Sequence, residues 1–340
     1  MNKFKNILIV RTDRMGDVVL TIPAIRALRE TYPLARITLW MSRSTKELAA
    51  GLPFIDEIII EYKTRGWFGF FEQVAILRKK KFDLAIIFHT KKRTNAACFL
   101  AGIPYRLGYR NNKFGFLLNH PVVDERHLGI KHEAEYCMDL LKHIGVNGTD
   151  LKLQVSRDKE ADIWAQDFFT KHKLSGKPVI AMHPAASCPT RFWPVEFYAD
   201  LADRLIRENK VAVIIVGDKL VQPAAGKIIA RAGNGAIDVA GQTSLSQLIS
   251  LISLCRVLIS NDSGPVHLAA AVGIPVISIF LRAQSGINPL RWRPLGANSV
   301  LIQNKNGEEI ILNSSGKVIS GRFDSISVEE VFLKAQPFVL

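Results

Sequence analysis

The chain has 340 residues, which is long for one hydrophobic core and about right for two domains of ~150 residues each. Apolar residues make up 48% and charged residues 22%, so a disordered chain is excluded, and no apolar run approaches the ~18 residues of a membrane-spanning helix. The net charge is +14, concentrated in residues 1–160, which hold 27 Lys and Arg against 17 Asp and Glu. Such a surface attracts nucleic acid, an anionic membrane or a phosphorylated substrate, unless it is only a solvated basic face.

Cysteines and histidines give no sign of a metal or disulfide framework. The four cysteines form no CxxC pair, and the eight histidines show no HExxH spacing. This usage favours a reducing compartment. The apolar stretch near the N-terminus spans only four residues before Arg11, too short for a signal peptide. We therefore expect a cytoplasmic protein without a bound metal.

Short β-branched runs alternate with amphipathic stretches in the first half of the chain. This alternation predicts βαβ units around a parallel sheet. The expected strands are 6–10, 36–40, 57–62 and 83–88, and the expected helices lie near 18–31, 44–51, 68–80, 94–101 and 131–145.

The same alternation starts again near residue 178 and predicts a second doubly wound sheet. Its expected strands are 178–183, 211–217, 257–262 and 275–280, and its expected helices are 194–209, 245–255 and 265–273. We therefore predict an α/β chain of two Rossmann-like domains facing a cleft, over residues 1–160 and 175–325, followed by a C-terminal segment 326–340 with helical character. Residues 146–177 are the expected linker, with a helix at 158–172. Ligands of such folds bind at the carboxyl ends of the strands.

The stretch SNDSGPVHLAAAVGIPVISIF, residues 260–280, joins a strand to a helix through a tight turn. A helix N-terminus presents free N–H groups and a positive dipole end, which suit a phosphate. Ser263 adds a hydroxyl, Gly264 lets the backbone approach a ligand closely, and His267 lies in the first turn. The alternative is that Asp262 or Ser263 only caps the helix and His267 packs locally.

Two further junctions lie at the same predicted sheet edge. HPAASCPTRFW, residues 183–193, offers the hydroxyl of Ser187 and the guanidinium of Arg191, which could pair with a diphosphate. Its alternative is an ordinary loop anchored by a buried tryptophan. After the next strand, Gly217 and Asp218 could contact a ribose or a base, although any such turn looks similar. The chain lacks GxGxxG, Walker A, DxD and GxSxG motifs, so a phosphate must be neutralised by helix ends and basic side chains.

The first junction, RTDRMGDVVLTIPAIRALRE, places two aspartates in a loop that opens a helix. Taken with the two later junctions, this stretch resembles the ADP-heptose:lipopolysaccharide heptosyltransferase family, family-nine glycosyltransferases of the GT-B type. The matching stretches are ILIVRTDRMGDVVLTIPAIRALRETYP, HPAAS with RFWPVEFYADLADRL, and NDSGPVHLAAAVGIPVISIF, within residues 6 to about 280.

The resemblance implies an inverting, metal-independent transfer that needs no cofactor. The donor would be a nucleotide sugar, by default ADP-heptose, bound by the C-terminal domain. The acceptor would be an anionic lipopolysaccharide core, bound by the N-terminal domain at the cytoplasmic face of the inner membrane, where the protein would associate peripherally. A phosphorylated lipid of this kind is a polyanion, which agrees with the basic first half.

Residue by residue, the resemblance implies that Asp17 is the general base. Capping of the following helix is the alternative role of Asp17, and Asp13 is the competing base. The expected donor-binding residues are Ser187, Arg191, Gly217, Asp218, Asp262, Ser263, Gly264 and His267. The expected acceptor-binding residues are Arg11, Asp13, Arg14, Lys91, Lys92 and Arg93.

Two segments depart from the family pattern and leave the sugar open. LRAQSGINPLRWRPLG, residues 281–296, is longer and richer in arginine than the family's loop, and the tail 303–320 is unfamiliar. A transferase for a different nucleotide sugar is therefore the first alternative. A basic nucleic-acid-binding module is the second, but the aromatic stretch RGWFGFF, residues 65–71, fits a lipid surface better, so we expect no nucleic-acid partner.

Overall fold

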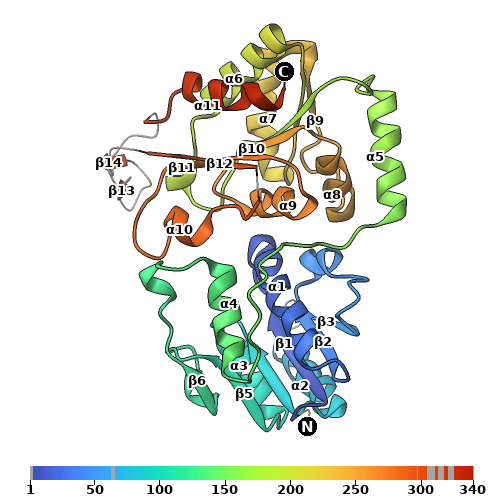
Figure 1. Cartoon of the computed structure of the whole chain (residues 1–340), viewed down its shortest axis with the longest axis vertical. Helices are drawn as coiled ribbons and strands as arrows, with labels where there is room; N and C mark the ends of the chain where they lie inside the picture. The colour runs from blue at the N-terminus through green and yellow to red at the C-terminus, as the bar shows by residue number, and fades with distance from the viewer. Residues whose placement is uncertain are drawn as a thin grey trace. The chain divides into compact units, whose positions relative to one another are not determined.

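Two parallel sheets of six strands each account for the alternating pattern of the sequence. The computed structural model describes residues 3–62, 66–296, 298–304, 311–312, 318–320 and 325–339. The chain divides into two units, Met1–Ser156 (unit 1) and Arg157–Leu340 (unit 2). Figure 1 shows the elements of both units along the chain. The predicted fold class, two doubly wound α/β domains, is confirmed.

In unit 1 the strands follow the order β3-β2-β1-β4-β5-β6, and every neighbouring pair is parallel. The central strands carry unbroken apolar runs because helices cover both faces of the sheet. The strands are β1 Asn6–Arg11, β2 Arg36–Met41, β3 Glu57–Ile60, β4 Leu84–Ile87, β5 Tyr105–Tyr109 and β6 His120–Val122. The helices are α1 Met15–Thr31, α2 Gly66–Lys80, α3 Lys92–Leu100 and α4 Glu133–Lys142, with short 3-10 helices η1 Arg43–Leu48, η2 Gly115–Leu117 and η3 Arg126–Leu128.

In unit 2 the order is β12-β11-β10-β7-β8-β9, again with parallel pairs throughout. The strands are β7 Val179–His183, β8 Ala212–Ile215, β9 Ala236–Asp238, β10 Val257–Asn261, β11 Val276–Phe280 and β12 Ser299–Gln303, with a separate antiparallel pair, β13 Ile311–Leu312 and β14 Val318–Ser320. The helices are α5 Lys159–Lys171, α6 Val195–Asn209, α7 Gln222–Ala232, α8 Leu245–Ser253, α9 Gly264–Val272, α10 Pro289–Trp292 and α11 Val328–Ala335, with 3-10 helices η4 Pro189–Arg191, η5 Lys219–Val221, η6 Gly233–Gly235 and η7 Gln336–Phe338.

Each sheet has a point where the strand order reverses. In unit 1 it lies between β1 and β4, and in unit 2 between β7 and β10. Loops that leave neighbouring strands in opposite directions open a crevice at the carboxyl edge of a parallel sheet, and ligands bind there. Both reversal points carry sequence-predicted site residues.

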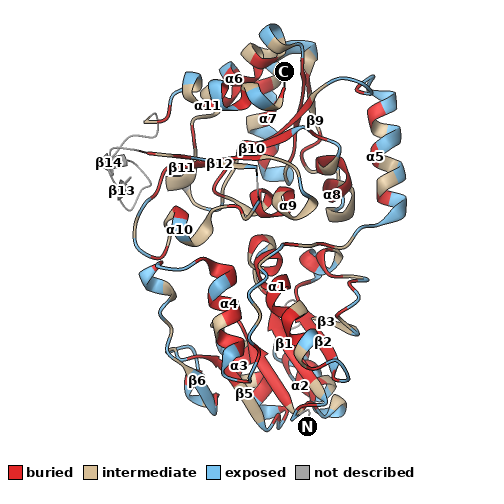
Figure 2. Cartoon of the chain, viewed as in Figure 1, coloured by how far each residue is buried: buried red, intermediate tan, exposed pale blue. Residues whose placement is uncertain are grey.

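Burial follows the same layers. In Figure 2 the central strands of both sheets, such as β1 and β10, are mostly red, while α5 turns an exposed face outward. Trp193 and Tyr198 are fully buried in the core of unit 2, and Val331 and Phe332 of α11 join the same cluster. The C-terminal segment 326–340 therefore supplies core residues of unit 2. The expected linker 146–177 contains α5, most of it within unit 2, because the apolar stripe of α5 packs there against α8.

Several local expectations change. The helix expected near 44–51 is the 3-10 helix η1, and the strand expected at 57–62 ends at Ile60. Residues 305–310 and 313–317 of the unfamiliar tail lie outside the described residues.

No helix within the described ranges combines the length and the apolar character needed to cross a membrane.

Candidate functional site

The β1–α1 junction of unit 1 gathers acidic side chains around one buried arginine. Helix α1 begins at Met15, and its N-cap position is Arg14, whose side chain makes no capping hydrogen bond. Asp17 therefore lies inside the first turn of α1 and is not the helix cap. A carboxylate in this turn is favoured by the positive end of the helix dipole.

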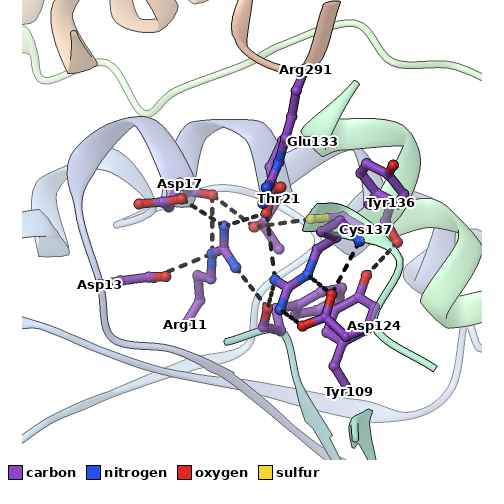
Figure 3. Close-up of polar contacts among 12 residues, drawn as sticks. Arg11, Asp13, Asp17, Thr21, Tyr109, Asp124, Glu133, Tyr136, Cys137 and Arg291 are labelled. Atoms are coloured by element: carbon purple, nitrogen blue, oxygen red, sulfur yellow. Dashed lines mark hydrogen bonds and ion pairs between the residues drawn. The ribbon is translucent and has the colours of Figure 1, made fainter. Parts of the chain in front are cut away.

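Arg11 ends β1 and is only 1% exposed. Its guanidinium lies 3.1 Å from Oδ1 of Asp17, 3.2 Å from Oδ1 of Asp13 and 3.3 Å from Oε1 of Glu133. It also donates to the carbonyl oxygen of Phe88, at 2.9 Å. Figure 3 shows the side chains of Asp13, Asp17 and Glu133 around the guanidinium of Arg11. The guanidinium of Arg11, expected to bind the acceptor, thus makes its contacts with groups of the protein itself.

A second arginine closes the cluster from the other side. Arg126 donates to both oxygens of Asp124, at 2.8 and 2.7 Å, and to the Phe88 carbonyl, at 3.1 Å. Its guanidinium also lies 3.9 Å from the Tyr109 ring centroid and 3.8 Å from Oε1 of Glu133. Glu133, which is 1% exposed, thus bridges two guanidinium groups. Paired charges of this kind are needed to keep each other buried.

The two aspartates of the loop differ in acidity. Burial raises the pKa of Asp17 to about 6 against the charge of Arg11, and the negative charges of Asp13 and Glu133 add to the rise. Burial also acts to raise the pKa of Asp13, but the positive charges of Arg11 and Lys91 outweigh it and lower that pKa. Environments that separate the pKa values of two carboxyls assign them different roles, and the one near neutrality suits proton transfer.

The three basic residues of the KKR stretch, predicted to bind the acceptor, contact different parts of unit 1. Lys91 donates to the carbonyl and hydroxyl oxygens of Thr12, at 2.8 and 2.9 Å, and so lies beside the aspartate loop. Lys92 lies over the Phe114 ring, while Arg93 donates to the Tyr62 carbonyl at 2.7 Å. Arg14, at the start of α1, is exposed. Of the KKR stretch, Lys91 lies beside the β1–α1 junction, which also carries Arg11 and Arg14.

In unit 2 the β10–α9 junction is built as the sequence predicts. Ser263 is the N-cap of α9, but its side chain makes no capping bond. Its hydroxyl instead lies 2.9 Å from that of Ser260 and 3.2 Å from Nδ1 of His183. Burial lowers the pKa of His183 to about 4, so this ring is neutral at pH 7. Gly264 begins the helix, and His267, in its first turn, is only 3% exposed.

Asp262 stands at this junction between two arginines. Nη1 of Arg191 donates to its carbonyl oxygen at 3.2 Å and lies 3.5 Å from Oδ2. Nη2 of Arg282, directly after β11, lies 3.9 Å from the same Oδ2. Burial raises the pKa of Asp262, and both arginines oppose the rise. Nε and Nη2 of Arg282 are buried and form no hydrogen bond with any described residue. The positive charge of the two guanidinium groups and of the N-terminus of α9 thus exceeds the negative charge of the one carboxylate. This excess positive charge favours the binding of an anion.

The other expected donor-binding residues, Ser187, Gly217 and Asp218, lie on the loops that follow β7 and β8. Trp193 anchors the loop that carries Arg191, since its backbone N–H donates to Asn261 and its ring N–H to the Ile326 carbonyl. Gly217 has φ +148°, and a Cβ there would meet the side chain of Val221. Asp218 is exposed and accepts from the backbone of the turn that follows it. Ser187 is exposed.

Sequence reasoning missed three residues of these clusters: Glu133, Arg126 and Arg282. Glu133 and Arg126 lie more than a hundred positions from Arg11, in a segment with no motif. Arg282 could have been found, because the arginine-rich stretch 281–296 directly follows a predicted strand and so begins at the carboxyl edge. In the part of the chain that the structure describes, no group of three or more His, Cys, Asp or Glu side chains could hold a metal ion.

Comparisons with known proteins agree with this layout. The sequence model described as glycosyltransferase family 9 (heptosyltransferase) matches residues 73–315. A lipopolysaccharide heptosyltransferase 2 of Escherichia coli K12 is 28% identical over 290 residues, covering 81% of this chain and 82% of the relative. A lipooligosaccharide heptosyltransferase 2 of Haemophilus ducreyi is 28% identical over 312 residues, covering 87% and 88%.

Solved structures share the fold over nearly the whole chain. A family 9 glycosyl transferase from Veillonella parvula superposes with a TM-score of 0.84 at 23% identity, covering 98% of this chain and 97% of that one. The ADP-heptose lps heptosyltransferase II of E. coli gives a TM-score of 0.80 at 23% identity, covering 98% of each chain. This chain therefore shares its fold with both of these solved structures.

Proposed function

The chain belongs to glycosyltransferase family 9 (heptosyltransferase), and on that premise we propose that it transfers a heptose from ADP-heptose to a lipopolysaccharide core acceptor. The relatives named above support the sugar and the acceptor class. A further structural neighbour, the E. coli heptosyltransferase WaaC, was solved with ADP, which supports an adenine nucleotide donor.

Asp17 is the general base of the proposed reaction. The observation that carries this assignment is the position and acidity of Asp17, which lies at the carboxyl edge of β1 with a pKa of about 6. Arg11 holds it in place, and the pKa of the neighbouring Asp13 is lowered. At neutral pH Asp17 is mostly ionised and can accept a proton. A base placed in this way contributes roughly 10²–10⁴-fold to the rate.

The reaction is a single inverting displacement. The acceptor hydroxyl attacks the anomeric carbon of the donor sugar and gives its proton to Asp17, while the bond between that carbon and the diphosphate oxygen breaks. The diphosphate leaves with its electron pair. Arg191, the hydroxyl of Ser263 and the N-terminus of α9 stabilise the growing negative charge, as preorganised donors do in other transferases. The residues proposed to complete the donor site are Ser187, Gly217, Asp218, Asp262, Gly264 and His267.

Acceptor binding falls to unit 1 in this proposal. Lys91 and Arg14, beside the aspartate loop, attract the phosphorylated core, and Lys92 and Arg93 extend the basic surface. The protein works in the cytoplasm, associated peripherally with the inner membrane face that carries the acceptor. Helix ends and arginines replace a metal at the diphosphate, so EDTA is expected to leave the rate unchanged. Strict metal dependence would contradict this scheme.

Incubation of the purified protein with ADP-heptose and a heptose-deficient lipopolysaccharide tests the function. Mass spectrometry of the acceptor is expected to show the gain of one heptose, and Asp17→Asn is expected to slow this gain by about 10²–10⁴-fold. The second candidate, a transferase for another nucleotide sugar, is favoured by the arginine-rich segment 281–296. A thermal-shift screen of nucleotide sugars separates the two, because stabilisation by a different sugar nucleotide and not by ADP-heptose would favour the second.

A further inference from the structure

We propose that one face of unit 1 docks directly onto an anionic lipid surface. This docking face is formed by α2, α3 and the loop around η2, which pack on the same side of the sheet over a shared apolar cluster. The proposal deepens the proposed function, on which it rests for the lipid nature of the acceptor. The surface residues that define the face are Trp67, Phe68, Phe71, Lys92, Arg110, Lys113, Phe114 and Phe116.

Large aromatic side chains are exposed on this face to an unusual degree. Trp67 is 78% exposed, Phe68 89%, Phe71 59% and Phe116 78%. Isolated exposed apolar residues need no explanation, but a gathering of whole aromatic rings marks an interaction site. The stretch 65–71 singled out in the sequence supplies three of them, and its first residue lies outside the described residues.

Contacts between rings and cations join the face into one surface. Trp67 packs edge-on against Phe70, whose ring lies 5.2 Å from the guanidinium of Arg93. The preceding residue, Lys92, has its Nζ 5.6 Å from the ring centroid of Phe114, and the Phe114 ring lies 5.7 Å from that of Phe116. Aromatic and basic groups therefore alternate across α2, α3 and the η2 loop.

The charge of this region is one-sided. The residues that define the face include three basic residues, Lys92, Arg110 and Lys113, and no Asp or Glu. Interfacial membrane-binding surfaces combine aromatic residues that enter the headgroup region with basic residues that attract anionic lipid. The charge complementarity selects an anionic membrane as the occupant of the face.

The position of the face is consistent with this partner. Helices α2 and α3 begin after the carboxyl ends of β3 and β4, so Trp67, Phe68 and Lys92 lie toward the edge of the sheet that also carries Asp17. If the protein docks through the first turns of α2 and α3, the carboxyl edge of the unit 1 sheet, which carries Asp17, faces the lipid. An acceptor anchored in the membrane would then reach that edge without leaving the bilayer.

Vesicle co-sedimentation of the full chain tests the docking face. Variant Trp67→Ser/Phe68→Ser/Phe71→Ser is expected to lower partition onto phosphatidylglycerol-containing vesicles by at least about tenfold, because it removes three exposed apolar anchors. Variant Arg110→Gln/Lys113→Gln is expected to lower it about fivefold per charge on these vesicles and not on phosphatidylcholine vesicles. The matched controls are Leu34→Ser, at an apolar side chain 89% exposed, and Lys46→Gln, both outside the face and expected to bind as wild type.

Unchanged vesicle binding by the aromatic variant, with its melting temperature preserved, would overturn the proposal. Binding of a DNA oligonucleotide in preference to vesicles, lost in the same variants, would also overturn it and indicate a nucleic-acid face. Transfer to a delipidated core oligosaccharide separates this proposal from the proposed function. The aromatic variant is expected to retain transfer to this soluble acceptor, because the acceptor does not need a membrane. If the wild-type protein binds vesicles through this face but transfers no sugar, the proposed function is contradicted and the docking face is not.

Discussion

The carboxyl edges of the two sheets carry charge clusters of opposite construction. In unit 1 one guanidinium, that of Arg11, is surrounded by the carboxylates of Asp13, Asp17 and Glu133. In unit 2 one carboxylate, that of Asp262, lies between Arg191 and Arg282 at the N-terminus of α9. Excess negative charge makes one carboxyl easy to protonate, while excess positive charge makes a site for an anion. The same fold thus provides a candidate base in one unit and a candidate diphosphate site in the other.

The largest expected effect comes from removing the base. Asp17→Asn is expected to lower kcat by about 10²–10⁴-fold, since it keeps the shape but cannot accept a proton. Asp13→Asn, its matched control at the same β1–α1 junction, is expected to lose far less, because the pKa of Asp13 is lowered. Steady-state kinetics with saturating donor measures both. A greater loss in Asp13→Asn would move the base assignment to Asp13.

The anion site of unit 2 is expected to show a smaller effect. Each charge-assisted hydrogen bond contributes about 1.5–3 kcal/mol, so Arg191→Gln and Arg282→Gln are each expected to weaken ADP binding by about 10–100-fold. Isothermal titration calorimetry measures this dissociation constant. Arg256→Gln removes an exposed guanidinium just before β10, at the opposite edge of the sheet, and is the control. Equal affinity in Arg282→Gln and wild type would exclude Arg282 from the donor site.

The pH dependence tests the electrostatics of unit 1. Because the pKa of Asp17 is about 6, kcat/KM is expected to fall about tenfold per pH unit below that value as the base becomes protonated. Asp13→Asn removes one of the negative charges that raise this pKa, so its acidic limb is expected at lower pH. If the acidic limb of the kcat/KM profile lies at the same pH in Asp13→Asn as in wild type, the charge of Asp13 does not raise the pKa of Asp17.

The smallest expected effect is on stability. The pKa of Asp17 is raised from 3.8 to about 6, so the folded state binds its proton more tightly than the unfolded chain does. The associated stability is present at low pH and is lost as pH rises through about 6. Asp17→Asn is therefore expected to melt about 2–4 °C above wild type at neutral pH, with no gain near pH 4. Differential scanning calorimetry at both pH values checks this; a lower melting temperature at neutral pH would mean that the ionised carboxylate stabilises the fold.

Local sequence patterns determined most of the elements that form the two edges. The apolar run ILIV predicts β1, and the turn residues and proline after Asn261 predict the start of α9, because periodicity and backbone preference act over a few residues. The strands β5 and β6 escaped prediction. The first contains arginine and glycine, the second is three residues long with a proline, and only pairing with the existing sheet makes either extended.

The chemistry within those elements was decided by tertiary structure. The sequence alone placed Asp13 and Asp17 in one loop and Asp262 at a helix start, but could not say which carboxyl binds a proton more tightly. That depends on burial and on charges brought from distant segments: Glu133 reaches Arg11 across 122 positions, and Arg282 approaches Asp262 from the next strand of the sheet. A pattern of residue types records which groups are present along the chain, whereas a pKa depends on the distance and desolvation that only the packed fold sets.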